Sequence, residues 1–356
     1  MNLKKLKNMR TNVSLVTVGF LASLLIFACS PSNCDETPTP APEVTKPQTF
    51  TNISKVTFPS LLDANFRDSL NGYICGFGGF VSKTSNGGSS WTNVNIPSTS
   101  DVYGVHFINN SEGYAGAYNG DIFKTTNAGT SWTKLTTPTS GFAYGQFHFF
   151  DASNGIAVGG SASTAGSLIK TTNGGSTWTN IPVTGLSSVY DIKFIDNTTG
   201  YICGSNNSIF KTTDGGATWV NQPVTITTPA NNFILLAEIE FVNPTVGYCV
   251  GYSVSYDKNF IFKTTNAGAT WNQLTSPAQT SATADAYTSF FAPNANEIYI
   301  VGGNVNNNTG TLLKSTDGGI SWSNIPLNTS RLFGSTYIQN SSFIVGLNGT
   351  IIKSSN

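Results

Sequence analysis

One nine-residue motif occurs six times along the chain, and this repeat constrains the fold more than any other feature of the sequence. Each copy contains Lys, two hydroxyl residues, Asn or Asp, Gly or Ala, Gly, one variable residue, Ser or Thr, and Trp, as in KTTNGGSTW at residues 170–178. Successive motif lysines lie 41, 46, 41, 52, 51 and 39 residues apart when a truncated seventh copy at Lys353 is included. This spacing is close to the period of about 40–50 residues that is typical of β-propeller blades. Every tryptophan of the chain ends a copy of the motif: Trp91, Trp132, Trp178, Trp219, Trp271 and Trp322.

Each repeat divides into four short strands separated by turn residues, as the second repeat illustrates. The apolar runs of that repeat predict strands at residues 102–108, 113–117, 121–125 and 131–135. Asn119-Gly120 is a strong hairpin signal between the middle two strands. In the motif turn we expect the Asn or Asp side chain to accept a backbone N–H two residues on, while the glycines adopt positive φ. We expect the Trp to lie between adjacent blades as a large apolar contact.

The two ends of the repeat region complement each other. The seventh repeat supplies three strands, at residues 332–338, 343–347 and 349–353, and the chain ends before its Trp strand. Near the start, Phe50-Thr51-Asn52-Ile53 resembles the Trp strand at residues 91–94, with Phe50 in place of Trp. A ring closed by this N-terminal strand has no exposed sheet edge at its ends. The sequence therefore predicts an all-β fold over residues 49–356, a seven-bladed β-propeller with four-stranded antiparallel blades.

The motif resembles the Asp-box, also called the bacterial neuraminidase (BNR) repeat, S/T-x-D/N-x-G-x-x-W. The longer pattern of GY-x-x-G, then the Lys-Thr-Thr box, then Trp is similar to photosystem II stability/assembly factor-like propellers of bacterial envelopes. The resemblance covers about residues 49–356 and implies the propeller fold. It implies little about function, because sialidases, xyloglucan hydrolases, sorting receptors and assembly factors all carry Asp-boxes.

The N-terminal residues are expected to direct and anchor the protein rather than to fold. Residues 1–28 have four basic residues ahead of an uncharged run, the layout of an export signal. The segment Leu25-Ile26-Phe27-Ala28-Cys29 resembles the bacterial lipobox, which implies lipidation at Cys29. An ordinary cleaved signal and an uncleaved anchor helix are the other interpretations. Residues 29–48 are rich in Pro and Thr and predict a disordered tether. We expect a monomeric lipoprotein of the bacterial cell envelope, at the outer membrane or cell surface, that meets the membrane only through its lipid.

Charge and cysteine usage exclude several function classes. Without the four basic leader residues the chain has 14 basic against 18 acidic side chains, whereas nucleic-acid binding needs a basic surface. Cys75 and Cys203 share a repeat position, and Cys249 lies one residue earlier in its repeat. Blades 1 and 4 are not adjacent in a ring of seven, so we expect buried free thiols rather than a disulfide. No Cys or His pair has metal-ligand spacing, and we expect no metal and no cofactor.

The first strand of each blade should border the central channel, so its polar residues are the candidate ligand-binding site. Aligning the repeats on a Phe near the end of this strand places both histidines of the chain at one repeat position. Phe290 and Thr336 are expected there in the last two repeats. Two interpretations are open: the side chains line a wet channel, or they form a ligand site. The ring position alone does not fix metal geometry. The candidates are Asp63, Asn65, His106, Gln146, His148, Asp191, Lys193, Glu238 and Glu240.

Loop lengths favour one face of the propeller for binding. Because strands alternate in direction, connections from second to third strands and from blade to blade lie on one face, opposite the motif turns. We call this the long-loop face. The additions occur there, at residues 162–166, 225–232, 252–259, 279–285 and 304–310. Variable loops on a rigid scaffold are where binding usually resides. The motif lysines are expected to cover apolar surface with their stems and to keep their ammonium groups in water.

These features favour a binding or assembly module without enzyme activity, which recognises an envelope protein or a glycan through the long-loop face or the channel. The resemblance to sialidases implies three substrate-binding arginines, but only Arg67 and Arg331 follow the leader. Xyloglucan hydrolases imply paired propellers, and photosystem assembly implies an arginine-rich surface. The alternative is a glycoside hydrolase with paired carboxylates drawn from Asp63, Asp191, Glu238 and Glu240.

Overall fold

The computed structural model describes residues 48–355 apart from residue 56 and the segments 139–142, 162–163, 186–187, 228–232, 254–257 and 278–284. The chain divides into two units, Met1–Thr45 and Lys46–Asn356, of which only the second contains described residues. The predicted leader, the lipidation at Cys29, nearly all of the tether and parts of the long loops lie outside the described residues. The described part of the chain has no helix that is long and apolar enough to cross a membrane.

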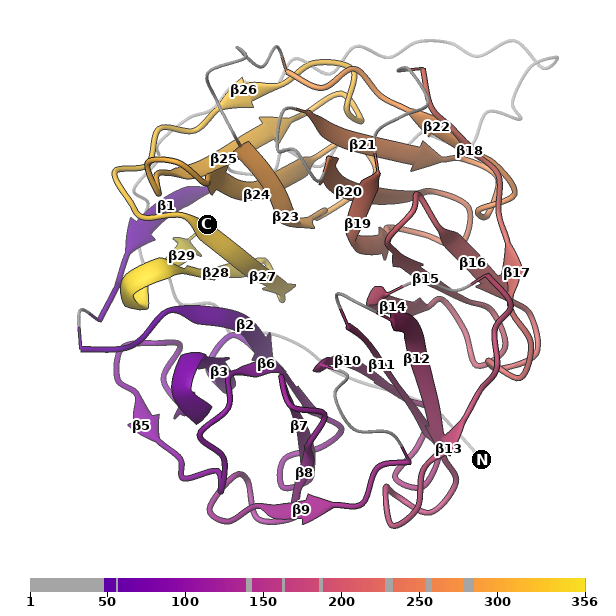
Figure 1. The fold of residues 1–356 in the computed structure, drawn as a ribbon. Coiled ribbons are helices and arrows are strands. Elements are labelled where there is room, and N and C mark those ends of the chain that lie inside the picture. Colours follow the sequence, from indigo (N-terminus) through magenta and orange to yellow (C-terminus); the bar gives the residue numbers. More distant parts are fainter. Residues whose placement is uncertain are drawn as a thin grey trace, which may run out of the picture. The chain divides into compact units, whose positions relative to one another are not determined.

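Seven sheets follow one another along the chain and form the blades of a propeller, as predicted. Figure 1 shows the first strand of each blade nearest the centre. Blades 1 and 2 contain β2 (Leu61–Phe66), β3 (Gly72–Gly76), β4 (Phe80–Thr84), β5 (Thr92–Asn93), β6 (Val102–Phe107), β7 (Gly113–Ala117), β8 (Ile122–Thr125) and β9 (Thr133–Leu135). Blades 3 and 4 contain β10 (Ala143–Phe149), β11 (Gly155–Ser161), β12 (Thr164–Thr171), β13 (Thr179–Asn180), β14 (Val189–Phe194), β15 (Gly200–Gly204), β16 (Ile209–Thr212) and β17 (Val220–Asn221).

Blades 5 to 7 complete the ring. Blade 5 contains β18 (Val224–Thr225), β19 (Ile234–Phe241), β20 (Gly247–Ser253), β21 (Asn259–Thr264) and β22 (Trp271–Gln273). Blade 6 contains β23 (Asp285–Phe291), β24 (Ile298–Asn304), β25 (Gly310–Ser315) and β26 (Ser323–Asn324). Blade 7 contains β27 (Leu332–Ile338), β28 (Ser341–Gly346), β29 (Ile351–Ser355) and β1 (Thr49–Asn52). Two short 3-10 turns, η1 (Phe77–Gly79) and η2 (Leu347–Gly349), connect second to third strands in blades 1 and 7.

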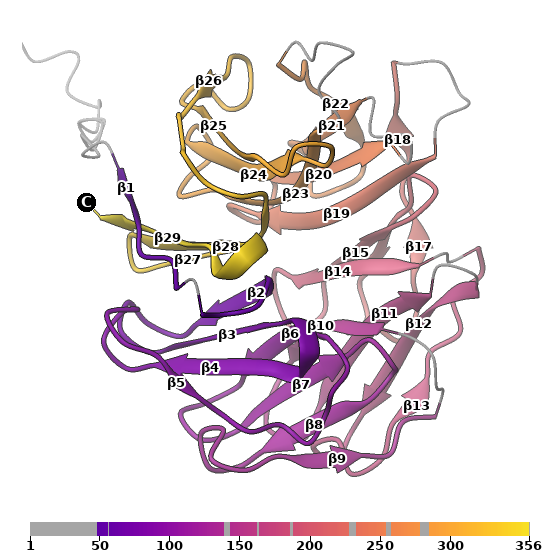
Figure 2. The same ribbon diagram turned by 60° about the vertical axis from the view of Figure 1, so that its left-hand side comes forward.

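The N-terminal strand completes the last blade, which confirms the predicted closure. β1 pairs antiparallel with β29, with Thr49 opposite Ser355 and Asn52 opposite Ile352. Figures 1 and 2 both show β1 beside β29. Phe50 lies where other blades have Trp, and its ring contacts that of Tyr299 edge-on, with 5.5 Å between ring centroids. The two ends of the described chain therefore belong to one sheet.

The core of the described residues consists of seven apolar clusters, each formed by two adjacent blades. Six of them contain one motif Trp, and the cluster between blades 6 and 7 contains Phe50 instead. The predicted position of the Trp between blades is therefore confirmed. Since each blade shares its core with both neighbours, the stability of one blade depends on the next. The three cysteines in this core, Cys75, Cys203 and Cys249, are free and buried, as predicted.

Two side chains, not one, close each motif turn. In blade 3, Thr171 Oγ1 accepts the N–H of Gly175 at 2.8 Å, and Asn173 Oδ1 accepts the N–H of Thr177 at 2.9 Å. All six copies form the same two bonds. The expected donor was the N–H two residues after the Asn, but the observed donor lies four residues after it. The reason is that two successive residues with positive φ, 64° and 82° in this blade, turn the chain back toward the Asn.

The motif lysines join neighbouring blades. Lys211 Nζ donates a hydrogen bond of 2.7 Å to the carbonyl oxygen of Ala267, in the motif turn of the next blade, and Tyr201 donates to the same oxygen. The expectation that the ammonium groups remain in water is wrong for six lysines. Lys314 pairs with Glu297 at 2.7 Å, and five others find a carbonyl acceptor in the next turn. The equivalent bonds, between 2.9 and 3.1 Å, come from Lys83, Lys124, Lys263 and Lys353.

Replacing Lys211 with Met should lower the free energy of unfolding by about 1–2 kcal/mol, because a hydrogen bond from a charged donor is lost while the apolar stem is kept. Lys170→Met is the matched control. Lys170 lies opposite Ile156, whereas Lys211 lies opposite Tyr201. Within the described residues Lys170 forms no bond to the next blade. Its replacement should change stability by less than about 0.5 kcal/mol. Equal losses for both variants in urea denaturation would contradict a stabilising role for the inter-blade bond.

Blade 5 departs from the predicted four-stranded pattern. The connection that follows blade 4 contributes β18, which pairs parallel with β22 as a fifth strand. Part of the extra length of blades 3, 5 and 6 forms strand. Their second strands have seven residues, whereas those of blades 1, 2 and 4 have five. The additions thus lengthen these hairpins toward the long-loop face.

Candidate functional site

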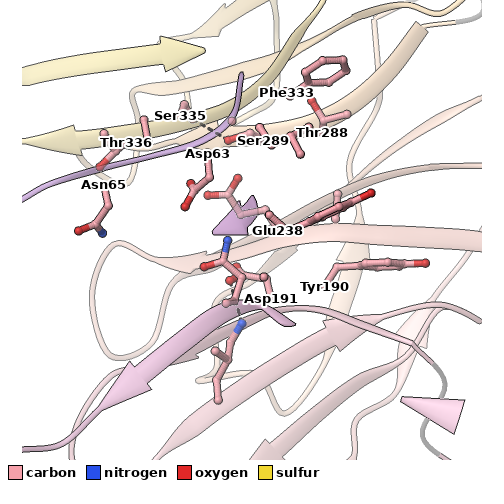
Figure 3. A pocket seen from close by; sticks show the side chains of 18 of the residues that line it. Asp63, Asn65, Tyr190, Asp191, Glu238, Thr288, Ser289, Phe333, Ser335 and Thr336 are labelled. Carbon is pink, nitrogen blue, oxygen red and sulfur yellow. Dashed lines mark hydrogen bonds between the residues drawn. The ribbon is translucent and has the colours of Figure 1, made fainter. Parts of the chain in front are cut away.

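A cavity of about 460 Å³ lies where the first strands of all seven blades meet. The structure brings every channel residue predicted from the sequence to its wall. Figure 3 shows Asp63, Asp191 and Glu238 in this pocket, on three different strands. The predicted residues that line it are Asp63, Asn65, His106, Gln146, His148, Asp191, Lys193, Glu238 and Glu240.

A β-bulge in each first strand determines which side chains face the cavity. In β14, Val189 pairs with Gly204 and Asp191 with Cys203, so Tyr190 is the extra residue. The other six first strands have a bulge at the same position. The residue after the bulge takes the upper-level position: Asp63, Gly104, Gln146, Asp191, Glu238, Ser289 and Gly334. The residue two positions on takes the lower-level position: Asn65, His106, His148, Lys193, Glu240, Phe291 and Thr336. All of these residues except Gly104 and Phe291 line the cavity.

The register corrects one predicted position. Thr336 lies at the expected place in blade 7, but in blade 6 the equivalent residue is Phe291, not Phe290. The alignment relied on the Gly that opens the second strand of the first five blades. In blade 6, Ile298 opens that strand, and the Phe290-Phe291 pair offered two possible anchors.

The upper-level carboxyls link adjacent blades while they line the cavity. Asp63, Asp191 and Glu238 each accept a backbone N–H from the first strand of the following blade, at 3.2, 2.9 and 3.1 Å. At Gly104 a Cβ atom would lie 1.6 Å from the carbonyl oxygen of Gly145. The neighbouring strand therefore occupies the space that a side chain would need at position 104.

The lower level contains an ion pair and two imidazoles. Lys193 Nζ lies 2.6 Å from Glu240 Oε2 across the boundary between blades 4 and 5. His106 stacks on Phe149, with 6.2 Å between ring centroids, and His148 stacks on Phe194 at 4.5 Å. Neither imidazole is hydrogen-bonded to another residue of the described chain. Their ring nitrogens are therefore available to a ligand in the cavity.

Burial within the ring of strands shifts the pKa values of most of these groups toward the neutral form. It raises the pKa of Asp63 to about 6 and that of Asp191 to about 7, and it raises the pKa of Glu238 well above its ordinary value. Burial likewise lowers the pKa of each cavity imidazole to about 4. For Lys193 burial acts against the charge, but Glu240, Asp191 and Glu238 together outweigh it, so its pKa is raised.

At neutral pH the cavity wall is therefore rich in hydrogen-bond acceptors and carries little net charge. The side chains are only half-buried, but they face a narrow space enclosed by protein, which explains the strong effect of burial. Within the described part of the chain, no group of three His, Cys, Asp or Glu side chains is placed to hold a metal ion. The arrangement can bind a donor group and exchange protons with it.

The residues at the mouth of the cavity were not predicted from the sequence. The bulge residues Tyr103 and Tyr190 line the cavity and are 38% and 39% exposed, and the bulge residue Phe333 also lines it. Figure 3 shows Tyr190 and Phe333 on one side of the upper-level carboxyls, with Asn65 and Thr336 on the other. The available signal was an aromatic residue directly before the upper-level position in three repeats.

Comparisons with known proteins agree with this architecture. The family model described as photosynthesis system II assembly factor YCF48 matches residues 43–181, 173–236 and 225–348. A comparison with curated proteins finds no match. A solved structure of YCF48 bound to D1 peptide is 17% identical, with a TM-score of 0.68 over 86% of this chain and 97% of that one.

Two further structures share the fold. YCF48 from Cyanidioschyzon merolae is 16% identical, with a TM-score of 0.63 over 85% of this chain and 98% of that one. An ancestral GH74 enzyme is 17% identical, with a TM-score of 0.65 over 85% of this chain but only 46% of its own. At these identities the likeness to solved structures establishes the propeller fold alone.

Proposed function

The chain belongs to the photosynthesis system II assembly factor YCF48 family, and from this premise we propose that it is a protein-binding module. It engages a polypeptide segment of its partner at the long-loop face, with the mouth of the central cavity at the middle of the contact. The YCF48 structure with a bound D1 peptide supports a polypeptide partner. The partner of this chain is an envelope protein, because we also propose that a lipid on Cys29 anchors the chain, as a monomer, at the outer membrane or cell surface.

The distribution of exposed aromatic residues carries the proposal. Eight large apolar side chains are exposed within the described residues, and five of them lie on the long-loop face. Tyr118 stacks with Tyr103 at 5.8 Å between ring centroids. Aromatic side chains clustered on one rigid face are typical of protein-binding hot spots. The five residues are Phe77, Tyr103, Tyr118, Tyr190 and Phe233.

The experiment compares two faces of the same protein. The variant Tyr103→Ala/Tyr190→Ala/Phe233→Ala removes aromatic surface from the long-loop face. Val220→Ala/Ile320→Ala removes exposed apolar side chains near the motif turns and is the matched control. Pull-down from envelope extracts should recover a partner with the wild type and the control, and at least about ten times less with the aromatic variant.

Three outcomes would count against the proposal. Equal recovery with all three proteins would place binding elsewhere on the surface. Release of reducing sugar from xyloglucan by the wild type, but not by Glu238→Gln, would replace it with the glycoside hydrolase alternative. A partner that is released by free glycan rather than by peptide would favour a glycan ligand.

A further inference from the structure

We propose that the cavity receives a cationic side chain, the guanidinium of an arginine or the ammonium of a lysine, from the bound polypeptide. This inference rests on the proposed function, and it adds the chemistry by which the partner is recognised.

The cavity wall is rich in carboxyl groups that have no cationic partner in an ion pair. Four carboxyl groups line the cavity, and within the described lining residues Lys193 is the one Lys or Arg side chain. Lys193 is already paired with Glu240 at 2.6 Å. Asp63, Asp191 and Glu238 therefore share the cavity without a cationic partner. Each of them accepts a backbone N–H of the next blade, and Asp191 Oδ1 also accepts the N–H of Ile192 at 2.8 Å. A carboxyl group has further acceptor positions.

A second, independent argument comes from the imidazoles. His106 and His148 line the same cavity and form no hydrogen bond with other residues of the described chain. Burial lowers the pKa of both to about 4, so at neutral pH each ring keeps one nitrogen as an acceptor. A ligand with several N–H donors would satisfy acceptors that the protein leaves unpaired. An anionic ligand would meet carboxyls instead.

The aromatic mouth suits the same ligand. A cation gains attraction when it lies near the face of an aromatic ring, and Tyr103, Tyr190 and Phe333 line the cavity. The chain already forms such a contact on this face, where the guanidinium of Arg331 lies 5.1 Å from the ring centroid of Phe333. A cationic side chain that enters the mouth would pass these rings before it reaches the carboxyls.

Entry of a cation should also release protons. The groups that face it are Asp63, Asp191, Glu238 and Glu240, the two neutral imidazoles, and Lys193. In the empty cavity burial raises the pKa of Asp63 to about 6 and that of Asp191 to about 7. A nearby positive charge favours the ionised carboxylates, so binding is coupled to loss of their protons. Binding should therefore strengthen between pH 5 and about pH 8.

The test uses the full-length protein and two capped pentapeptides, acetyl-Gly-Gly-Arg-Gly-Gly-amide and the same peptide with citrulline. Citrulline has nearly the shape of arginine but no charge. Titration calorimetry at pH 7.5 should show at least about tenfold tighter binding of the arginine peptide. Heats in phosphate and Tris buffers should differ by an amount that reports net proton release.

Variants locate the effect. Glu238→Gln and, independently, Asp63→Asn should each reduce the preference for arginine at least about fivefold. Asp151→Asn replaces a carboxylate in the exposed turn that follows β10, outside the cavity lining, and it should leave the preference unchanged. Two variants are used so that a folding defect in one does not decide the result.

Equal affinity for the two peptides, or no detectable binding of either, would overturn the cationic ligand. The same holds if Asp151→Asn lowers the preference as much as Glu238→Gln. The pull-down with the aromatic variant tests the proposed function separately, because it requires a partner but not a charged side chain.

Discussion

A chain that begins at residue 55 is expected to unfold at least about 10 °C below a chain that begins at residue 46. The shorter chain lacks β1, which supplies the fourth strand of blade 7 and the ring of Phe50 between blades 6 and 7. Removing a fully buried Phe side chain costs about 3–5 kcal/mol, and the partly buried Phe50 contributes a fraction of that. The lost strand pairing and the newly exposed edge of β29 add to this, for a total of about 5 kcal/mol or more.

Thermal and urea unfolding, followed by tryptophan fluorescence and circular dichroism, would measure the difference. Phe50→Ala should destabilise by an intermediate amount, and Thr51→Ala, at an exposed position of the same strand, should change stability by less than about 0.5 kcal/mol. Equal melting temperatures for the two truncated chains would show that β1 does not hold the ring closed.

Asp63→Asn is expected to stabilise the protein at pH 8 by about 2 kcal/mol and to leave its stability unchanged at pH 4. Burial raises the pKa of Asp63 from 3.8 to about 6 in the folded protein. The folded state therefore binds more protons than the unfolded state between these values, and wild-type stability falls as pH rises through that window. One pKa unit corresponds to about 1.4 kcal/mol, and the estimate of about 2 kcal/mol allows for partial exposure to the cavity. Asn keeps an oxygen for the N–H of Val105 and has no charge to bury.

The two cavity histidines change the stability with pH in the opposite direction, so their contribution must be separated from that of the Asp63 carboxyl. Their lowered pKa values mean that the unfolded state takes up more protons as the pH falls from about 6.5 to 4, which destabilises the folded state. The comparison is therefore made between Asp63→Asn and wild type at each pH, so that the contribution of the histidines cancels. Urea denaturation should give a gain that grows from pH 4 to pH 6 and then levels off. A constant gain at all pH values would contradict the assignment.

The ring architecture was predictable because the repeated motif marks the end of each blade in the sequence. The Trp, the turn glycines and the spacing between copies all indicate the same blade boundaries. The segment around Phe50 supplied the fourth strand that the seventh repeat lacks. The nine candidate residues came to one cavity because the first strands of all blades share one register. The lysines were predicted wrongly, since their acceptors belong to the following blade and no pattern within one repeat describes that distance.

The residues at the mouth of the cavity were not predicted, because their positions depend on how the strands pair. Strict alternation makes neighbouring side chains point to opposite faces, but the bulge inserts Tyr103 or Tyr190 outside that alternation. A bulge has no characteristic residue type in the sequence. It becomes visible only when the pairing of the two strands is known. In blade 6 no Gly opens the second strand, so the sequence did not mark the register, and the lower-level residue is Phe291.

The composition of the cavity wall has a consequence for how binding and folding are connected. Its lining runs from Leu62 to Thr336 and draws on one strand from every blade, so no fragment of the chain contains a usable part of it. Any ligand held there is bound only by molecules whose ring is complete, and it favours that state by mass action. A bound ligand would therefore indicate that the propeller is complete, and unfolding of a single blade would release it.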